Sequence, residues 1–129
     1  KSTETFEAVK CGIDNMKKGF APILEKYHDM SPVHSLNNLA LVVWAFLSFD
    51  NYDEAVGEAV TAGWDTDCNG ATVGGLMGLH LSEVPSKWVE PWQGRVCTSI
   101  SGLGELNLNG LINRTLLLVK DFSDIKDIH

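Results

Sequence analysis

The chain has 129 residues, 44% of them hydrophobic, which is enough apolar material to build the packed core of one domain. It carries 10 basic against 17 acidic residues and a net charge of −7, which argues against nucleic acid as its main partner. The longest apolar run, Leu39 to Phe49, is shorter than the roughly 18 residues that a membrane span requires. We therefore expect a globular domain that binds neither nucleic acid nor membrane.

Three cysteines, Cys11, Cys68 and Cys97, stand far apart in the chain. An odd number at wide spacing matches neither a disulfide framework nor a structural zinc pattern. The first four residues are polar and do not resemble the apolar part of a signal peptide. A reducing, cytoplasmic compartment is the simplest interpretation.

The first half of the chain has helical periodicity. Apolar residues recur every three or four positions over residues 6–27, and Gly19 and Pro22 predict a break within that stretch. Ser31-Pro32 has the residue types of a helix start, with Ser as N-cap and Pro in the first turn. From there to residue 49 the chain is apolar nearly all round, which predicts a central, buried helix.

A shorter helix is predicted over residues 53–62, with Asp50-Asn51-Tyr52-Asp53 as its turn and cap and Gly63 at its end. Its predicted inward-facing residues are Ala55, Val56, Ala59 and Val60. Residues 63–69 are predicted to form a loop, and residues 70–81 return to helical periodicity, with Val73, Leu76, Met77 and Leu81 on one face.

The remaining segments are less regular. Residues 85–94, which include Trp88 and Trp92, predict a loop or a broken helix, and the Ser- and Gly-rich residues 96–105 predict a loop. A last helix is predicted from about Asn107 to Lys120, with Leu108, Leu111, Ile112, Leu118 and Val119 facing inward. No segment predicts a strand and the connections are short, so we expect one all-α domain over residues 1–129.

The segment between Gly63 and Gly70 has the most informative polar pattern. Asp65 and Asp67 stand two residues apart, and in a tight turn both carboxylates can face one hard cation such as Mg²⁺, Mn²⁺ or Ca²⁺. The alternative is helix capping, since aspartates accept hydrogen bonds from the first backbone N–H groups and suit the positive end of the helix dipole. From this segment taken alone, capping is the favoured interpretation.

An EF-hand calcium loop is a further alternative, because Asp65-x-Asp67-x-Asn69-Gly70 matches its first half. That loop also needs a bidentate Glu at its twelfth position, which here is Leu76. We therefore reject it.

Small residues follow at helical spacing: Ala71, Gly74, Gly75 and Gly78. Each glycine costs up to ~1 kcal/mol relative to alanine inside a helix, so the pattern predicts close packing against a neighbouring helix.

The string from Gly63 to Gly78, GWDTDCNGATVGGLMG, resembles the C-terminal signature of the ADP-ribosylglycohydrolase family. That signature has a Gly-Gly-Asp-Thr-Asp-Thr core, then a small-residue helix, then a Pro and a Trp. Here Val84-Pro85 and Trp88 stand at the matching distance, and the resemblance extends over about residues 30–120.

The resemblance implies an all-α, orthogonal helical bundle, of which this chain is expected to be only the C-terminal portion. It also implies a two-metal site for Mg²⁺ or Mn²⁺ and hydrolysis of the glycosidic bond that joins ADP-ribose to a protein side chain, or of a related ribosyl substrate. Asp65 and Asp67 match the metal-ligating aspartates of the family. The resemblance assigns no catalytic acid or base to this chain.

Three departures from the family pattern affect the expected site. Cys68 stands where the family usually has a hydroxyl ligand, and its softer sulfur suits Mg²⁺ poorly, so its role as a ligand is open. Trp64 replaces the usual second glycine, and either stacks on a base or ribose of the substrate or is buried in the core. The family's N-terminal Thr-Asp-Asp-type segment has no counterpart here, although a two-metal site needs several carboxylates.

Because of that missing segment, we expect the isolated chain to be incomplete and inactive. We also expect it to associate with a second copy of itself through the apolar face that the missing part leaves bare. The alternative to an enzyme is a catalytically dead structural relative, like the crystallin-like members of the superfamily, and Cys68 favours that alternative slightly.

Overall fold

The computed structural model describes the backbone of residues 2–126 and the side chains of residues 2–120. The chain divides into two compact units, one up to Val84 and one from Pro85 onward. The first contains α1 (Ser2–Asp14), α2 (Ala21–Lys26), α3 (Ser35–Ser48), α4 (Tyr52–Thr61) and α5 (Thr66–Leu81). The second contains α6 (Ser86–Val89), the 3-10 turn η1 (Glu90–Trp92), β1 (Arg95–Cys97), β2 (Glu105–Asn107) and α7 (Leu108–Lys126). The prediction that the whole chain forms one domain stays a prediction.

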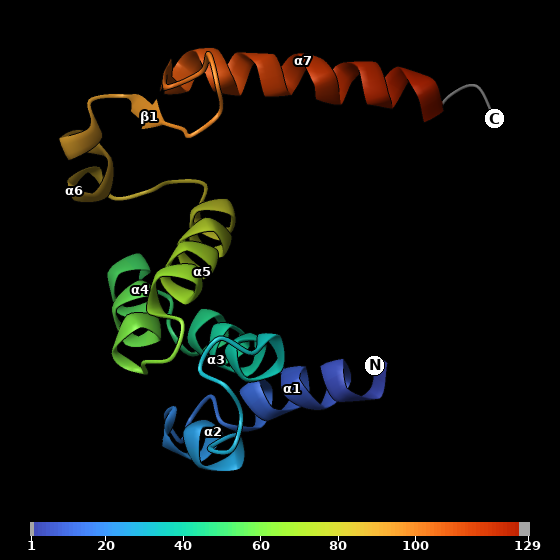
Figure 1. The fold of residues 1–129 in the computed structure, drawn as a ribbon, viewed down its shortest axis with the longest axis vertical. Coiled ribbons are helices and arrows are strands. Elements are labelled where there is room, and N and C mark those ends of the chain that lie inside the picture. The colour runs from blue at the N-terminus through green and yellow to red at the C-terminus, as the bar shows by residue number, and fades with distance from the viewer. Residues whose placement is uncertain (1, 127–129) are drawn as a thin grey trace. The chain divides into compact units, whose positions relative to one another are not determined.

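Most of the described chain is helical, which confirms the predicted all-α class (Figure 1). The predicted break near Gly19 and Pro22 is confirmed, since α1 ends at Asp14 and α2 begins at Ala21. None of the described helices has the length and apolar character needed to cross a membrane.

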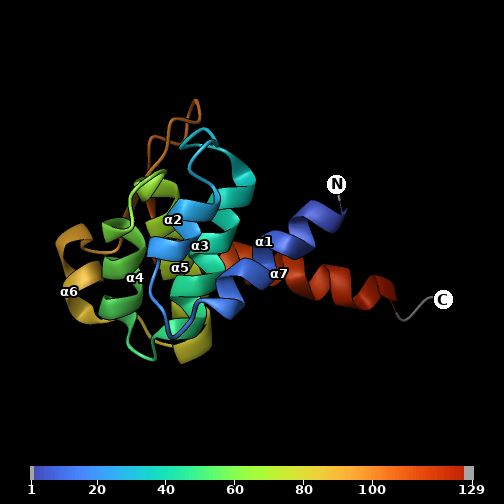
Figure 2. The ribbon, with the colours of Figure 1, turned by 90° about the horizontal axis from the view of Figure 1, so that it is seen from below.

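Helix α3 is the centre of the first unit, as its apolar sequence predicts. It packs against α1, α2, α4 and α5, which gather around it (Figures 1 and 2). Ala40, Leu41, Trp44 and Ala45 are all buried along it. The Trp44 ring meets Phe20 and Phe49 edge to face, with ring centroids 5.5 and 5.7 Å away. The Trp44 side chain therefore contacts both the start of α2, at Phe20, and the end of α3, at Phe49.

The predicted start of this helix at Ser31-Pro32 is wrong. The helix begins at Ser35, and His34 is its N-cap, with Nδ1 accepting a hydrogen bond from the Leu36 N–H at 3.2 Å. Ser31 instead opens a turn in which its carbonyl accepts from the His34 N–H at 2.9 Å. The helix starts late because the carbonyls of Ser31 and Pro32 accept hydrogen bonds from side chains of its own first turn.

Helix α4 begins as predicted. Asn51 is its N-cap, and Oδ1 accepts from the backbone N–H groups of Asp53 and Glu54. Ala55, Val56 and Ala59 are buried as predicted, but Val60 is 44% exposed, so its predicted inward orientation is wrong. Gly63 follows the helix with a φ of +89°, the left-handed conformation that commonly ends helices.

Helix α5 begins at Thr66, so the prediction of a loop through residue 69 is wrong. Of the four small residues predicted to pack closely, Gly74 lies against α4, whereas Gly78 lies near Val84 and Ala71 is exposed. A Cβ on Gly74 would lie 2.9 Å from the Tyr52 hydroxyl oxygen, and one on Gly70 would lie 3.0 Å from the Val60 side chain. Gly75 faces open space. Among the residues predicted to face inward, Val73 and Met77 are fully buried, whereas Leu76 and Leu81 are exposed.

The second unit contains a short antiparallel hairpin, so the prediction of a loop over residues 96–105 is wrong at its two ends and confirmed for residues 98–104. Strands β1 and β2 pair with Val96 opposite Leu106, and Thr98 closes the connection by donating from its backbone N–H to the Gly104 carbonyl. Strands of three residues are too short to show alternation in the sequence. Helix α7 begins at Leu108, close to the predicted start, but Leu111, Ile112 and Leu118 on it are exposed rather than buried. The expected self-association stays a prediction.

Two glycine substitutions test the packing of α1 on α3. A Cβ at Gly12 would lie 2.7 Å from the Ala40 carbonyl oxygen and 2.8 Å from Val43, so backbone has to move to accept it. We expect Gly12→Ala to lower the free energy of unfolding by about 1–3 kcal/mol, as overpacked cores do. At Gly57 in α4 nothing lies within 4 Å of the added Cβ. Gly57→Ala is the matched control, and it should raise stability by up to about 1 kcal/mol.

Urea denaturation of the whole chain measures both variants. A Gly12→Ala protein as stable as the unchanged chain would contradict the close approach of α1 to α3.

Candidate metal centre

The turn from α4 to α5 places two consecutive residues in the left-handed region. Gly63 has a φ of +89° and Trp64 a φ of +57°. A side chain other than glycine costs roughly 1–2 kcal/mol in this region. The Trp64 side chain is half-buried and packs against the core, which offsets that strain. Its core packing agrees with one of its two interpretations, while a contact with substrate stays a prediction.

Asp65 follows at the N-cap position of α5, but its carboxylate makes no capping hydrogen bond within the described chain. A carboxylate oxygen of Asp65 instead lies within 4.8 Å of the Cys68 sulfur. The capping interpretation is therefore wrong for the Asp65 side chain. The helix still begins there through its backbone, since the Asp65 carbonyl accepts from the Asn69 N–H at 2.9 Å.

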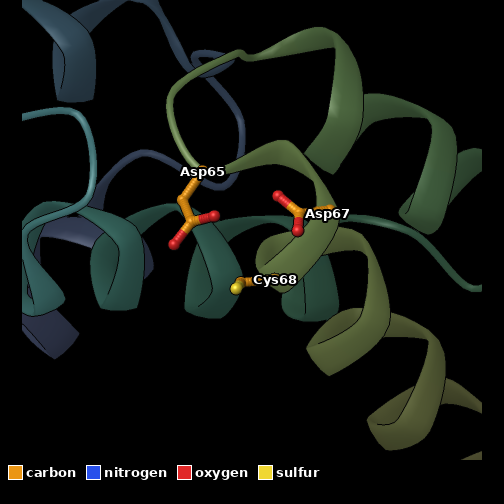
Figure 3. A group of neighbouring side chains, drawn as sticks. All are labelled: Asp65, Asp67 and Cys68. Carbon is orange, nitrogen blue, oxygen red and sulfur yellow. The ribbon is translucent and has the colours of Figure 1, made fainter. Parts of the chain in front are cut away.

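The early start of α5 brings Asp67 and Cys68 into its first turn beside Asp65. One ligand atom from each side chain, a carboxylate oxygen of either aspartate and the Cys68 sulfur, lies within 4.8 Å of the other two. The three side chains point toward one another (Figure 3). Asp65 is half-buried, whereas Asp67 and Cys68 are exposed. The cluster therefore contains three potential metal-ligating side chains that are accessible to solvent and to a cation.

The negative surroundings act on the Cys68 thiol. Its hydrogen bond to Asp65 raises the pKa of the thiol above its ordinary value, and the charges of Asp65 and Asp67 raise it further. Both effects favour the protonated thiol, because a thiolate would be a third negative charge beside two carboxylates. In the absence of a cation, Cys68 is therefore a hydrogen-bond donor and a poor nucleophile.

Asn38 on α3 holds the start of α5 in place. Its Oδ1 accepts from the Asn69 Nδ2 at 2.7 Å and from the Asp65 backbone N–H at 3.4 Å. Its Nδ2 donates to the carbonyls of Pro32 and His34 at 2.8 and 2.9 Å. Asn38 and Asn69 are both buried, so this network is shielded from water. The cluster is thus tied to the central helix by one amide side chain.

Sequence reasoning missed this support. Asn37 extends it, since its Nδ2 donates to the Ser31 carbonyl and its Oδ1 accepts from the Asn38 N–H. The signal that could have found it is the adjacent pair Asn37-Asn38 within an otherwise apolar helix, because buried amides have to be hydrogen-bonded.

A family model described as ADP-ribosylglycohydrolase matches residues 4–118 of the chain. The match covers most of the chain and includes the cluster of Asp65, Asp67 and Cys68. The chain therefore belongs to the ADP-ribosylglycohydrolase family, and the resemblance in its sequence is confirmed. Neither a curated protein nor a solved structure gives a match.

Members of this family generally depend on a divalent metal ion, and the donor set at the start of α5 fits such an ion in part. The carboxylates of Asp65 and Asp67 are the oxygen ligands that Mg²⁺ and Mn²⁺ prefer. The thiol of Cys68 is a softer donor than those ions favour. The positive φ of Trp64 gives a physical reason for the glycine that the family signature has at this position.

The Asn38 network yields a stability prediction. Asn38→Ala removes the acceptor of the Asn69 amide, which is 2% exposed, and should lower the free energy of unfolding by about 1–3 kcal/mol. Urea denaturation of Asn38→Ala, Asn69→Ala and the double variant measures the coupling between the two side chains. The double variant should lose less than the sum of the single losses. Strictly additive losses would show that the 2.7 Å hydrogen bond contributes nothing.

The raised pKa of the Cys68 thiol predicts how Cys68 reacts with iodoacetamide. In a Cys97→Ser background with a chelator present, Asp65→Ala removes both the hydrogen bond and the charge that raise the pKa of the thiol most. The pKa of the thiol should then fall, so that the midpoint of the rate–pH profile moves to lower pH and alkylation at pH 8 becomes faster.

Glu7→Ala, which removes an exposed carboxylate of α1, is the control and should leave the profile unchanged. Identical profiles for Asp65→Ala and the parent protein would refute the contact between Asp65 and Cys68. The remaining cysteine, Cys11, is buried and should react slowly in every variant.

Proposed function

We propose that this chain contributes part of the metal site of a hydrolase that cleaves the glycosidic bond of an ADP-ribosyl group. The substrate is an ADP-ribosylated protein side chain or a small ribosyl compound. Membership of the family supports the reaction class. The observation that carries the assignment to a site is the Asp65 carboxylate, which makes no cap for its helix within the described residues and meets Asp67 and Cys68 instead.

A divalent cation bound here, Mg²⁺ or Mn²⁺ by the family's pattern, would polarise bound ribose hydroxyls or a water. Asp65 and Asp67 are the residues that hold it. Their negative charge also suits the positive charge that develops on the ribose ring during glycosidic cleavage. Because Asp67 is exposed, the outer side of the cluster is open to a substrate.

Two carboxylates balance the charge of one divalent cation, whereas a two-metal site needs more. Within the described chain, Asp65, Asp67 and Cys68 are the one group of three or more His, Cys, Asp or Glu side chains close enough to share an ion. We therefore propose that this cluster holds one ion, and that ligands of a second ion lie outside it.

The alternative is a structural relative without catalysis. Cys68 in the position of a hydroxyl ligand favours it, since a site under selection for Mg²⁺ keeps oxygen donors. The two functions differ in one measurable respect, which is the release of ADP-ribose.

Isothermal titration with Mn²⁺ tests the site. The unchanged chain should bind one equivalent, and Asp65→Ala/Asp67→Ala should weaken binding by at least about tenfold, as loss of metal-site residues does. Glu4→Ala/Glu7→Ala removes two exposed carboxylates of α1 and is the matched control, which should bind normally. Equal binding by the two double variants would refute the site.

The reaction is tested separately, with Mn²⁺ present and with peptides ADP-ribosylated on arginine or serine as substrates. Release of ADP-ribose that Asp65→Ala/Asp67→Ala abolishes would support the hydrolase. Because the isolated chain is expected to be inactive under either function, the assay uses the full-length gene product, in which binding of Mn²⁺ without release of ADP-ribose from either peptide would favour the structural alternative.

A further inference from the structure

The donor set of the cluster disagrees with the hard ions that the family's pattern implies. Cys68 belongs to the same cluster, because its sulfur lies within 4.8 Å of a carboxylate oxygen of both Asp65 and Asp67. Its side chain points toward the same space as theirs (Figure 3). Sulfur is a ligand of soft or borderline cations, and Mg²⁺ avoids it. A cation that contacts both carboxylates therefore lies close to the thiol, which is a good ligand only for a thiophilic ion.

We infer that the cluster selects a thiophilic divalent cation of the Zn²⁺ class, with Cys68 as a ligand beside Asp65 and Asp67. This inference rests on the proposed function, in which the cluster binds a divalent metal. Two oxygens and one sulfur are three protein ligands, and a tetrahedral ion keeps its fourth position for water or substrate. Three protein ligands and an open position are the arrangement of catalytic zinc sites.

The geometry requires small movements. Zinc bonds of about 2.0–2.3 Å in a tetrahedron place neighbouring ligand atoms roughly 3.5 Å apart. The ligand atoms here lie within 4.8 Å of one another, so the side chains have to close by about 1 Å. Asp67 and Cys68 are exposed and can rotate, while the Asp65 backbone is held by Asn38. The position of Asp65 is therefore fixed by its backbone, whereas the side chains of Asp67 and Cys68 can move toward the ion.

The bound cluster carries one excess negative charge. Cys68 forms its bond to the cation as a thiolate and releases its proton to solvent, so the three ligands then carry a charge of −3 against +2. The three ligands lie at the N-terminal end of α5, where the positive end of the helix dipole stabilises this excess negative charge. Of the other cysteines, Cys11 is buried in the core of the first unit and Cys97 belongs to the second unit. Cys68 is therefore the thiol that shares this cluster.

The test compares Cys68→Ser with the unchanged residue, both in a Cys97→Ser background that removes the other exposed thiol. Serine keeps a side chain of similar size and supplies the hydroxyl of the family signature. Zn²⁺ binds most protein sites more tightly than Mn²⁺, so the diagnostic quantity is the ratio of the two affinities in each protein. Competition titrations give this ratio, and titration with Cd²⁺ or Co²⁺ detects a thiolate-to-metal charge-transfer band directly.

We expect one equivalent of Cd²⁺ or Co²⁺ to produce the charge-transfer band in the Cys68 protein and none in Cys68→Ser. The ratio of Zn²⁺ to Mn²⁺ affinity should fall by about tenfold or more in Cys68→Ser, through weaker Zn²⁺ binding. Asp65→Ala/Asp67→Ala should lose the band as well, since the thiol alone does not hold the ion.

Two other outcomes separate the failure of this inference from the failure of the proposed function. Mn²⁺ binding that depends on Asp65 and Asp67, without a charge-transfer band and with an unchanged affinity ratio in Cys68→Ser, would overturn the inference and leave the proposed metal site intact. Absence of specific binding for Mn²⁺, Zn²⁺ and Cd²⁺ alike would overturn both. Circular dichroism spectra and thermal melts of each variant establish that it folds, which is expected because Cys68 is exposed.

Discussion

The geometry of the candidate site depends on the side-chain amide of Asn38. Its oxygen joins the first turn of α5 to the central helix, and its nitrogen joins the central helix to the turn that precedes it. A buried amide that satisfies groups from three segments is a costly contact to lose, because each partner would remain buried without a replacement. The position of Asp65 follows from it, since the same oxygen accepts from the Asp65 N–H.

Around that fixed point, the turn between α4 and α5 accepts strain. Trp64 adopts a left-handed backbone that glycine adopts at no cost, and it is held there by the packing of its ring on the core. The Asp65 side chain makes no capping hydrogen bond within the described residues and lies beside Cys68 instead. Locally unfavourable choices of this kind gather at functional sites, where the surrounding structure maintains them.

The sequence predicted those parts of the fold that local patterns determine. The apolar stretch of α3, the break before Pro22 and the Asn51 cap follow from periodicity and capping chemistry. The start of α5 did not, because Asp65 to Asn69 is polar and its helical state depends on the Asn38 contact from α3. The resemblance in the sequence pointed to Asp65 and Asp67 and left the role of Cys68 open, and the structure places the Cys68 sulfur beside both carboxylates. The hairpin of the second unit has strands too short for any pattern.

The chemistry of position 68 is where an enzyme and a structural relative diverge. A serine or threonine hydroxyl there would also donate a hydrogen bond to Asp65, so hydrogen bonding does not explain why a thiol replaces a hydroxyl. Packing does not explain it either, since Cys68 is exposed. What sulfur changes is the class of ion that the two neighbouring carboxylates can share with it. Loss of a hard-ion ligand, which favours the structural relative, and a change of cofactor in an enzyme are therefore the two explanations of Cys68 that measurement of the ion preference separates.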